Sequence, residues 1–252
     1  MDQPYDRIAE LYDAEHASFA DDVVLYRELA RRTDGPVLEA MCGSGRLLVP
    51  LARAGYAVVG VDSSRAMLDR AQDAAVQAGV AARITLHHGD IRDPLPITDA
   101  ALAIVALNSF MHLTSSADQI RVLGRLHAAL KPGGLLVLDL LNLDPATIIA
   151  YDGSLVFDQT LQLDDGRLAQ KFVAQRADSG SQLLDVTFFY DTLDGVSVTR
   201  VTTSFTLRWL YRFEIEHLLA RCGFVIETVA GGYDLEPYTG RSDQLVVVAR
   251  RG

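Results

Sequence analysis

Apolar side chains recur at three- and four-residue spacing near the start of the chain, from residue 5 to about residue 33. The recurring positions are Ile8, Leu11, Tyr12, Val24, Leu25 and Leu29. This spacing places their side chains on one face of a helix. Residues 1–33 are therefore predicted to form an N-terminal helical cap.

Five short, mostly apolar runs follow, and helix-like stretches separate them. The runs lie at residues 36–41, 57–62, 83–90, 100–107 and 134–141. Apolar and polar residues do not alternate cleanly within them, which is typical of strands buried on both faces of a parallel sheet. Strands that alternate with helices are joined by right-handed crossovers, so the pattern predicts an α/β fold with a doubly wound, Rossmann-like sheet.

Two of the helix-like stretches carry start and stop signals. The first begins with Ser63 or Ser64 as its N-cap and ends at Gly79. The second has Ser116 as its predicted N-cap and Pro132-Gly133 as its stop. Such residues satisfy or terminate the free backbone groups at helix ends, which supports helices at both places.

The pattern changes to alternating, β-rich segments between residues 151 and 209. Asp165-Gly166, Ser179-Gly180 and Asp194-Gly195 divide this region. Dipeptides of this kind close short hairpins, so an antiparallel meander of about four strands is predicted. We interpret residues 151–209 as an inserted lid.

The main sheet is completed after the insertion. A helix-like stretch at residues 211–223 leads into apolar runs at 224–229 and 243–250. These two runs bring the mostly parallel sheet to seven strands. The predicted α/β core therefore consists of residues 34–150 and 210–252.

Charge and composition exclude several classes of protein. The chain has 23 Lys and Arg against 33 Asp and Glu, a net charge of -10, which disfavours a nucleic-acid partner because that binding depends on clustered cations. The acidic N-terminus lacks a signal-peptide core, and no apolar run approaches membrane-spanning length. We expect a cytoplasmic protein without a membrane partner, with Cys42 and Cys222 as free thiols. A homodimer is one alternative that the sequence leaves open.

The end of the first predicted strand, Glu39 to Gly45 (EAMCGSG), indicates a ligand site, because doubly wound sheets bind ligands beyond the carboxyl ends of their strands. Gly43 and Gly45 allow a sharp turn and a close backbone approach, although a tight strand-to-helix turn alone also favours glycine. Leu48 stands at the third small position of a dinucleotide fingerprint, which weakens a pyrophosphate interpretation. Glu39 suits an ammonium group better than phosphates.

Acidic residues also end the next two predicted strands. Asp62 could accept both hydroxyls of a ribose, or cap the helix that starts near Ser64. Asp90, together with the backbone of Ile91, could form hydrogen bonds with the amino-bearing edge of an adenine. Three acids at successive strand ends therefore suggest a ligand with an amine, a ribose and an adenine.

The chain resembles the class I S-adenosylmethionine-dependent methyltransferases. The resemblance rests on Glu39 to Gly45, Asp62, Asp90-Ile91, LNSFMHL at 107–113 and LKPGGLLVLDL at 130–140. It covers roughly residues 30–142 and resumes at CGF (222–224). The N-terminal YDRIAELYD and the β-rich insertion further resemble the small-molecule branch, including sugar N-methyltransferases of natural-product pathways.

The resemblance implies S-adenosylmethionine as cofactor. Glu39, Gly43 and Gly45 would hold its methionine end, Asp62 its ribose, and Asp90 with Ile91 its adenine. The full set of expected cofactor-binding residues is Tyr5, Glu39, Met41, Cys42, Gly43, Gly45, Asp62, Ser63, Met67, Asp90, Ile91 and Leu107. Cys42 belongs to this set by position and has no assigned chemistry.

The acceptor of the methyl group is expected to be a small molecule, methylated on nitrogen or oxygen. Such an acceptor must present a lone pair, so His112 is the candidate general base, with a loop histidine that caps the next helix as the alternative. Tyr12 is a second candidate for catalysis, because Tyr5 and Tyr12 would share a helix face; core aromatics are the alternative. The expected acceptor-binding residues are Tyr12, Asn108, His112, Trp209 and Tyr211.

Two other functions use the same predicted sheet. An NAD-dependent oxidoreductase is disfavoured by Leu48 and by the lack of a Tyr-x-x-x-Lys pair or an obvious set of metal ligands. A non-catalytic cofactor-binding protein would keep Gly43 and Asp62, and the sequence leaves it open. A nucleic-acid methyltransferase is opposed by the acidic charge and by LNSF at residues 107–110, where an Asn/Asp-Pro-Pro-Tyr/Phe/Trp motif would be expected.

Overall fold

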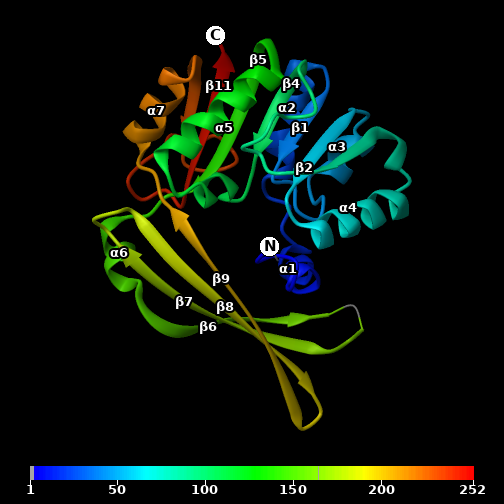
Figure 1. Ribbon diagram of the computed structural model, residues 1–252, viewed down its shortest axis with the longest axis vertical. Helices are drawn as coiled ribbons and strands as arrows, with labels where there is room; N and C mark the ends of the chain where they lie inside the picture. Colours follow the sequence, from blue (N-terminus) through cyan, green and yellow to red (C-terminus); the bar gives the residue numbers. More distant parts are fainter. Residues whose placement is uncertain (1–2, 164) are drawn as a thin grey trace.

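A computed structural model describes residues 3–163 and 165–252, and its main feature is a seven-stranded sheet (Figure 1). The strands, in spatial order, are β10 (Phe224–Ala230), β11 (Gln244–Arg251), β5 (Leu130–Leu141), β4 (Ala100–Val105), β1 (Val37–Ala40), β2 (Val58–Asp62) and β3 (Ile84–His88). Only the two pairings of β11 are antiparallel. The predicted doubly wound, mostly parallel sheet is confirmed, and its order reverses between β1 and β4, where such folds bind ligands.

Helices cover both faces of this sheet with two separate apolar clusters. On one face lie α2 (Val23–Thr33), α3 (Leu48–Arg53) and α4 (Arg65–Gln77); on the other lie α5 (Ser116–Ala129) and α7 (Arg212–Arg221). Shorter helices are α1 (Ala9–His16), α6 (Pro145–Ala150), η1 (Ala81–Arg83) and η2 (Ser109–His112). The central strands β1 and β4 are fully buried, as their continuous apolar runs predict.

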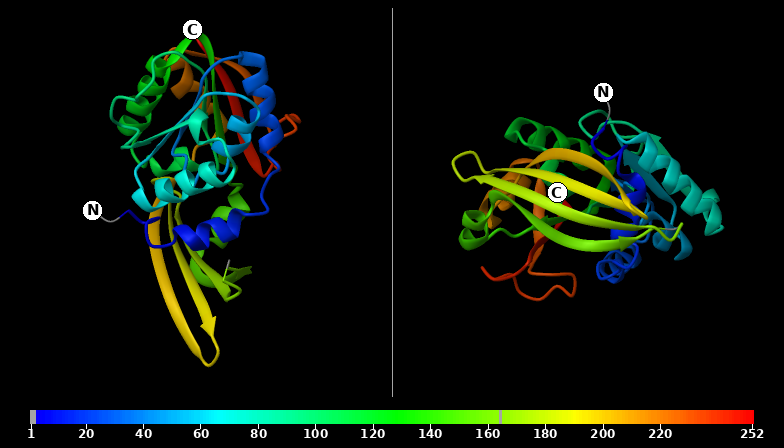
Figure 2. Two further views of the ribbon diagram at one scale, coloured as in Figure 1. Left: turned by 90° about the vertical axis from the view of Figure 1, so that its right-hand side faces the viewer. Right: turned by 90° about the horizontal axis from the view of Figure 1, so that it is seen from below.

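The second sheet is the antiparallel meander predicted for the insertion. Its strands are β6 (Asp152–Gln162), β7 (Leu168–Asp178), β8 (Leu183–Asp194) and β9 (Ser197–Arg208), paired in chain order. The three predicted turns join them. Figure 2 shows one curved sheet, with α1 between it and the main sheet. Lys171 of β7 pairs with Glu15 of α1 at 2.5 Å, and the Tyr190 hydroxyl donates to the same carboxylate at 2.9 Å, so α1 is fixed to the second sheet.

The N-terminal helical region consists of two helices with a non-helical connection between them. The chain leaves α1 after His16 and enters α2 only at Val23. Arg46 donates to both oxygens of the buried Asp22 carboxylate at 2.6 Å and to the Phe19 carbonyl at 3.4 Å. These tertiary contacts outweigh local helix periodicity. Tyr5 precedes α1 and does not share a helix with Tyr12.

Three local predictions are wrong in detail. Ser115, not Ser116, caps α5, because its hydroxyl accepts from the backbone N–H of Asp118. The helix ends at Ala129, and Pro132-Gly133 lies within the beginning of β5. The strand predicted at residues 83–90 is β3, which is partly exposed because it forms the sheet edge and pairs only with β2.

No helix within residues 3–163 and 165–252 combines the length and the apolar character needed to cross a membrane.

Candidate active site

A cavity of about 350 Å³ lies beyond the carboxyl ends of the parallel strands. It belongs to the size range of small-molecule sites. Strand ends and following loops supply Met41, Gly43, Asp62, Ser63, Ser64, Met67, Gly89, Asp90, Ile91, Arg92, Leu107, Ser109, His112, Leu113, Thr114 and Asp118. The N-terminal segment supplies Gln3, Pro4, Tyr5 and Tyr12, and β9 supplies Phe205 and Thr206. The cap and the second sheet therefore both reach the cavity.

The loop after β1 brings bare backbone to the cavity. Gly43 has a φ of +53°, and a Cβ added there would meet no atom of the described residues within 4 Å, so its surface faces open space. Gly45 does not line the cavity; at a φ of +84° it packs on α4, where an added Cβ would lie 3.1 Å from the Cβ of Ala71. The two glycines thus have different functions: Gly43 leaves room for a ligand, and Gly45 allows the close loop–helix contact.

Asp62 connects the loops that follow β1 and β2. Its carboxylate accepts from the backbone N–H groups of Gly43 and Ser64, both at 2.8 Å. Burial raises the pKa of Asp62, and these hydrogen bonds oppose the shift. A carboxylate offers about four acceptor positions in total, so Asp62 can also accept from a ligand hydroxyl. Ser64 caps α4 by accepting from the N–H of Met67, which leaves Asp62 available for a ligand.

Glu39 lies behind the cavity wall as a buried carboxyl. It is 4% exposed, and its Oε2 atom has no hydrogen-bond partner among the described residues. Burial raises the pKa of Glu39 to about 8, and the nearby Arg46 opposes this shift. A buried acceptor without a partner is costly, so the position favours a cationic or donor group on a ligand.

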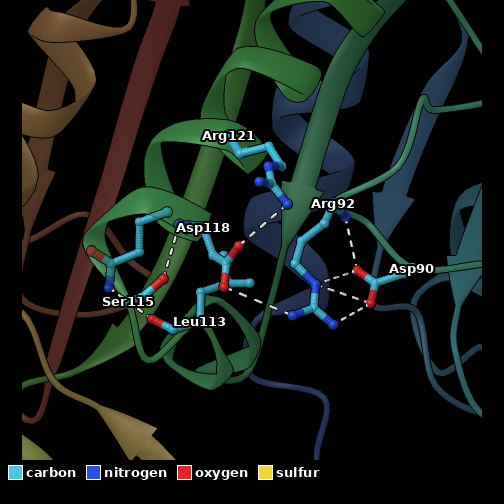
Figure 3. A network of polar contacts seen from close by, with 7 residues as sticks. Asp90, Arg92, Leu113, Ser115, Asp118 and Arg121 are labelled. Atoms are coloured by element: carbon cyan, nitrogen blue, oxygen red, sulfur yellow. Dashed lines mark hydrogen bonds and ion pairs between the residues drawn. The ribbon is translucent and has the colours of Figure 1, made fainter.

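Asp90 lines the cavity, but its carboxylate already binds an arginine (Figure 3). The Arg92 backbone N–H and Nε donate to Oδ1, both at 2.9 Å, and the guanidinium also binds Oδ2. These hydrogen bonds lower the pKa of Asp90. Arg92 also lies 3.8 Å from Asp118, which pairs with Arg121 at 3.6 Å. Asp90 therefore cannot be interpreted as a free acceptor, because a ligand amine would share it with Arg92.

His112 and Tyr5 form the opposite end of the cavity. Tyr5 Oη lies 3.1 Å from His112 Nε2, and the Phe205 ring lies 5.1 Å from the imidazole, centroid to centroid. Burial lowers the pKa of His112 to about 4 and raises those of Tyr5 and Tyr12, so all three are neutral at pH 7. His112 does not cap α5, because Ser115 does. The helix-capping interpretation of His112 is therefore wrong.

Several predicted site residues do not line the cavity. Trp209, 1% exposed, packs in the core cluster on the α5 face, and Tyr211 lies at the start of α7 with its side chain turned to solvent. The prediction that these two residues contact the acceptor is therefore wrong, because the strand–helix junction turns them away from the cavity. Cys42 is buried against Gly60, and Asn108 has a buried, unpartnered Oδ1 outside the lining. Like Glu39 and Gly45, these two residues lie behind the cavity wall.

Other lining residues carried little or no signal in the sequence. Arg92 lies two residues after Asp90, and this spacing from an acid is the one local signal that it carried. Phe205 carried no distinguishing signal, since alternation along a strand does not tell which face meets a ligand. Pro4 and Gln3 reach the cavity only through the tertiary placement of the N-terminal segment.

The residues present fit S-adenosylmethionine. The unpartnered oxygen of Glu39 suits an ammonium group, Gly43 offers space against bare backbone, and Asp62 can also accept from a ligand hydroxyl. Ile91 adds an apolar wall next to Asp90. This donor set contains no cluster of cations for phosphates, so a dinucleotide fits it less well.

Comparisons with known proteins agree with this site. Residues 37–134 match the family model of the methyltransferase domain. The cypemycin N-terminal methyltransferase of a Streptomyces species is 30% identical over 227 residues, which span 90% of this chain and 86% of that protein. The match gives no support to the oxidoreductase alternative.

Solved structures share the whole fold. The CcbJ methyltransferase from Streptomyces caelestis superposes with a TM-score of 0.81 at 23% identity, covering 100% of this chain and 98% of that one. CalS10, an amino pentose methyltransferase from Micromonospora echinaspora, gives a TM-score of 0.72 at 21% identity, covering 96% and 95%. The sequence match, together with the sheet order and the cavity, shows that the chain belongs to the class I S-adenosylmethionine-dependent methyltransferases.

Proposed function

We propose that this methyltransferase transfers the methyl group to an amine nitrogen of a small-molecule acceptor. The names of two related proteins support nitrogen as the acceptor atom, since one methylates an N-terminus and the other an amino pentose. The net charge of -10 disfavours a nucleic acid. In this proposal residues 1–33 form a cap and residues 151–209 a lid over the acceptor, while 34–150 and 210–252 bind the cofactor.

The cofactor would be held along the strand ends. Glu39 and the Gly43 loop would receive its methionine end, Asp62 its ribose, and Ile91 with Asp90 its adenine. When bound, S-adenosylmethionine supplies an activated methyl group on a positively charged sulfur. The chain then has to orient an acceptor lone pair in line with that group, which can supply an effective molarity of about 10⁵ M or more.

The observation that carries this proposal is the neutral, aromatic end of the cavity at His112. The Tyr5 and Phe205 rings lie against the imidazole, Tyr12 meets Tyr5 edge-on, and the cause of the lowered pKa of His112 is burial. The same burial would lower the pKa of an acceptor amine, because it disfavours the ammonium form. An amine bound here would therefore present its lone pair, which the reaction requires.

His112 and Tyr5 would handle the proton that the nitrogen loses. Neutral imidazole has one ring nitrogen that accepts and one that donates, and Tyr5 Oη lies at hydrogen-bond distance from Nε2. His112 would accept the proton either directly or through the Tyr5 hydroxyl. Tyr12, whose ring meets the Tyr5 ring edge-on at 5.7 Å, would limit where the acceptor can lie.

A methylation assay with a panel of acceptors tests the proposal. The purified protein is incubated with S-adenosylmethionine and with amino sugars, peptides and matched hydroxyl analogues in which oxygen replaces the nitrogen. We expect S-adenosylhomocysteine to form with an amine and the product to gain one methyl group on nitrogen. Methylation of the hydroxyl analogues in preference to the amines would contradict the proposal.

A further inference from the structure

The turn after β4 adopts a backbone conformation that its residues disfavour. Leu107 and Asn108 have φ values of 47° and 62°, the left-handed region that suits glycine. This turn leads directly into η2, which ends at His112. Leu107 and His112 both line the cavity. The shape of a disfavoured turn thus fixes where two site residues lie, and another part of the protein must hold it.

Asp139 on the neighbouring strand β5 makes the contacts that hold this turn. Its backbone carbonyl accepts from the N–H of Asn108 at 3.0 Å, and its Oδ2 accepts from the N–H of Leu107 at 3.0 Å. The Tyr233 hydroxyl donates to the same Oδ2 at 2.9 Å. In the amide orientation that satisfies its hydrogen bonds, Gln244 donates to Oδ1 at 3.1 Å. Donors therefore surround a carboxylate that is fully buried.

We propose that Asp139 is a positioning residue for methyl transfer, which fixes the turn of Leu107 and Asn108 and through it the place of His112, while Tyr233 holds the Asp139 carboxylate in position. This inference rests on the proposed function. Asp139 does not line the cavity, so it acts only through the turn. A carboxylate suits the task because both of its oxygens accept, so it can hold the Leu107, Tyr233 and Gln244 donors at once.

The charges around Asp139 give the proposal a pH dependence. Burial raises the pKa of Asp139 to about 6, while the hydrogen bonds from Tyr233 and Leu107 lower it. Asp22, at the start of α2, raises this pKa further, and Arg46, in the loop before α3, lowers it. Tyr26 of α2 and Tyr233 are further titratable neighbours, and both stay neutral because burial raises their pKa values. Activity should thus fall as the pH drops through about 6, since protonated Asp139 loses acceptor capacity, whereas the pKa of His112 is about 4.

Two variants and one control test this inference. Asp139→Asn removes the charge, and Tyr233→Phe removes one hydrogen bond. Tyr238→Phe is the control, because Tyr238 also donates a hydrogen bond at 2.9 Å to a residue at the end of β5, Asn142, but does not contact the turn. At saturating S-adenosylmethionine we expect kcat to fall by about 10- to 100-fold in Asp139→Asn, by misplacement of His112, and to stay unchanged in the control.

The pH profile separates positioning from a merely structural role. We expect Tyr233→Phe to move the acid limb of kcat above pH 6, because it removes a hydrogen bond that lowers the pKa of Asp139, and Asp139→Asn to abolish that limb. An unmoved limb in Tyr233→Phe, or a wild-type kcat in Asp139→Asn, would overturn the inference. If Asp139→Asn fails to fold, the position of the acid limb of kcat in Tyr233→Phe still tests the inference.

A measurement without turnover keeps this inference distinct from the proposed function. The protection factors of the Leu107 and Asn108 amides against hydrogen exchange, measured by NMR and corrected for the intrinsic pH dependence of exchange, should fall in Asp139→Asn and in wild type below pH 6. If wild type methylates no amine yet these amides lose protection, the proposed acceptor is wrong and the positioning of the turn stands. If amines are methylated and the amides keep their protection in Asp139→Asn, the positioning inference fails.

Discussion

Tyr5 Oη lies 3.1 Å from His112 Nε2, although 107 residues separate the two in the chain. This contact joins the N-terminal segment to the loop after β4 and closes one end of the cavity. Both groups are neutral at pH 7, because burial lowers the pKa of His112 and raises that of Tyr5. The pair can therefore pass a proton without creating a buried charge before the reaction begins.

Replacement of His112 tests its role as base. If the imidazole accepts the proton in the rate-limiting step, His112→Asn should lower kcat by roughly 10²–10⁴-fold and leave the affinity for S-adenosylhomocysteine nearly unchanged. Burial lowers the pKa of His112 to about 4, so its own limb in the pH–rate profile should lie near 4 and not near the usual value of about 6.5. Tyr5→Phe is the matched variant, because it removes the hydroxyl and keeps the ring.

Unchanged kinetics in His112→Asn would contradict this role. An acid limb near 4 that persists in His112→Asn, together with a kcat close to wild type, would show that His112 is not the base. Alignment of an amine that is already neutral would then carry the reaction.

Substitution of Asp62 should weaken cofactor binding. Asp62→Ala removes an acceptor for two charge-assisted bonds to the ribose, each worth roughly 1.5–3 kcal/mol. It also frees the N–H groups of Gly43 and Ser64, which the carboxylate now holds at 2.8 Å. Asp69→Ala is the control, since Asp69 is an exposed acid of α4 that does not line the cavity. Titration calorimetry with S-adenosylhomocysteine should show a large rise in Kd for Asp62→Ala only; equal affinity in a folded variant would disprove the ribose assignment.

Glu39 should release a proton when the cofactor binds. Burial raises its pKa to about 8, so the carboxyl is mostly protonated at pH 7 in the free protein. An ammonium group placed beside the unpartnered Oε2 would favour the carboxylate and expel the proton. Calorimetry in buffers of different ionisation enthalpy should therefore detect proton release, and Glu39→Gln should abolish it. Proton uptake, or the same release in the variant, would exclude Glu39 as the partner of the ammonium group.

The same shift predicts how Glu39 affects stability. A carboxyl whose pKa is higher in the folded state than its usual 4.5 contributes stability that is fully present below that value and is lost as the pH rises through about 8. The free protein should thus lose stability between these two values relative to Glu39→Gln. Thermal unfolding without cofactor at several pH values measures the difference.

The sequence predicted that the strand-end residues meet at one site, and the geometric reason is simple. Parallel strands bring their carboxyl ends to one edge, so Gly43, Asp62 and Asp90 had to lie close together once the strands were recognised. The state of their carboxylates was not predictable. Asp90 is bound by Arg92 and Asp62 by two backbone N–H groups, and both arrangements depend on loop conformation.

The acceptor half was harder to predict, because distant segments form it. Trp209 and Phe205 lie four residues apart, yet one packs in the core and the other lines the cavity. Hydrophobicity alone does not distinguish them. Tyr5 and Tyr12 do not share a helix, since α1 begins only at Ala9. The Asp22–Arg46 ion pair fixes the non-helical connection between α1 and α2. Tertiary contacts of this kind have no local signature in the sequence.

The second sheet should determine acceptor binding through Phe205. This residue extends from β9 into the cavity, 5.1 Å from the His112 ring and 5.7 Å from the Tyr5 ring, measured between centroids. Phe205→Ala removes that wall, so we expect the KM for the acceptor to rise by about tenfold or more, in line with the loss of one buried aromatic contact. The affinity for S-adenosylhomocysteine should change little, because the proposed cofactor contacts come from the strand ends of the main sheet.

Phe157→Ala provides the matched control for this variant. Phe157 is an aromatic residue of the same sheet, but it is 53% exposed and contacts Phe172 instead of the cavity. Steady-state kinetics with the methylated amine, beside calorimetry with S-adenosylhomocysteine, compares the two variants. If Phe205→Ala raises the Kd for S-adenosylhomocysteine as much as the KM for the acceptor, the residue serves the cofactor. If both variants behave as wild type, the second sheet does not contact the acceptor through Phe205, and the lid assignment loses its main support.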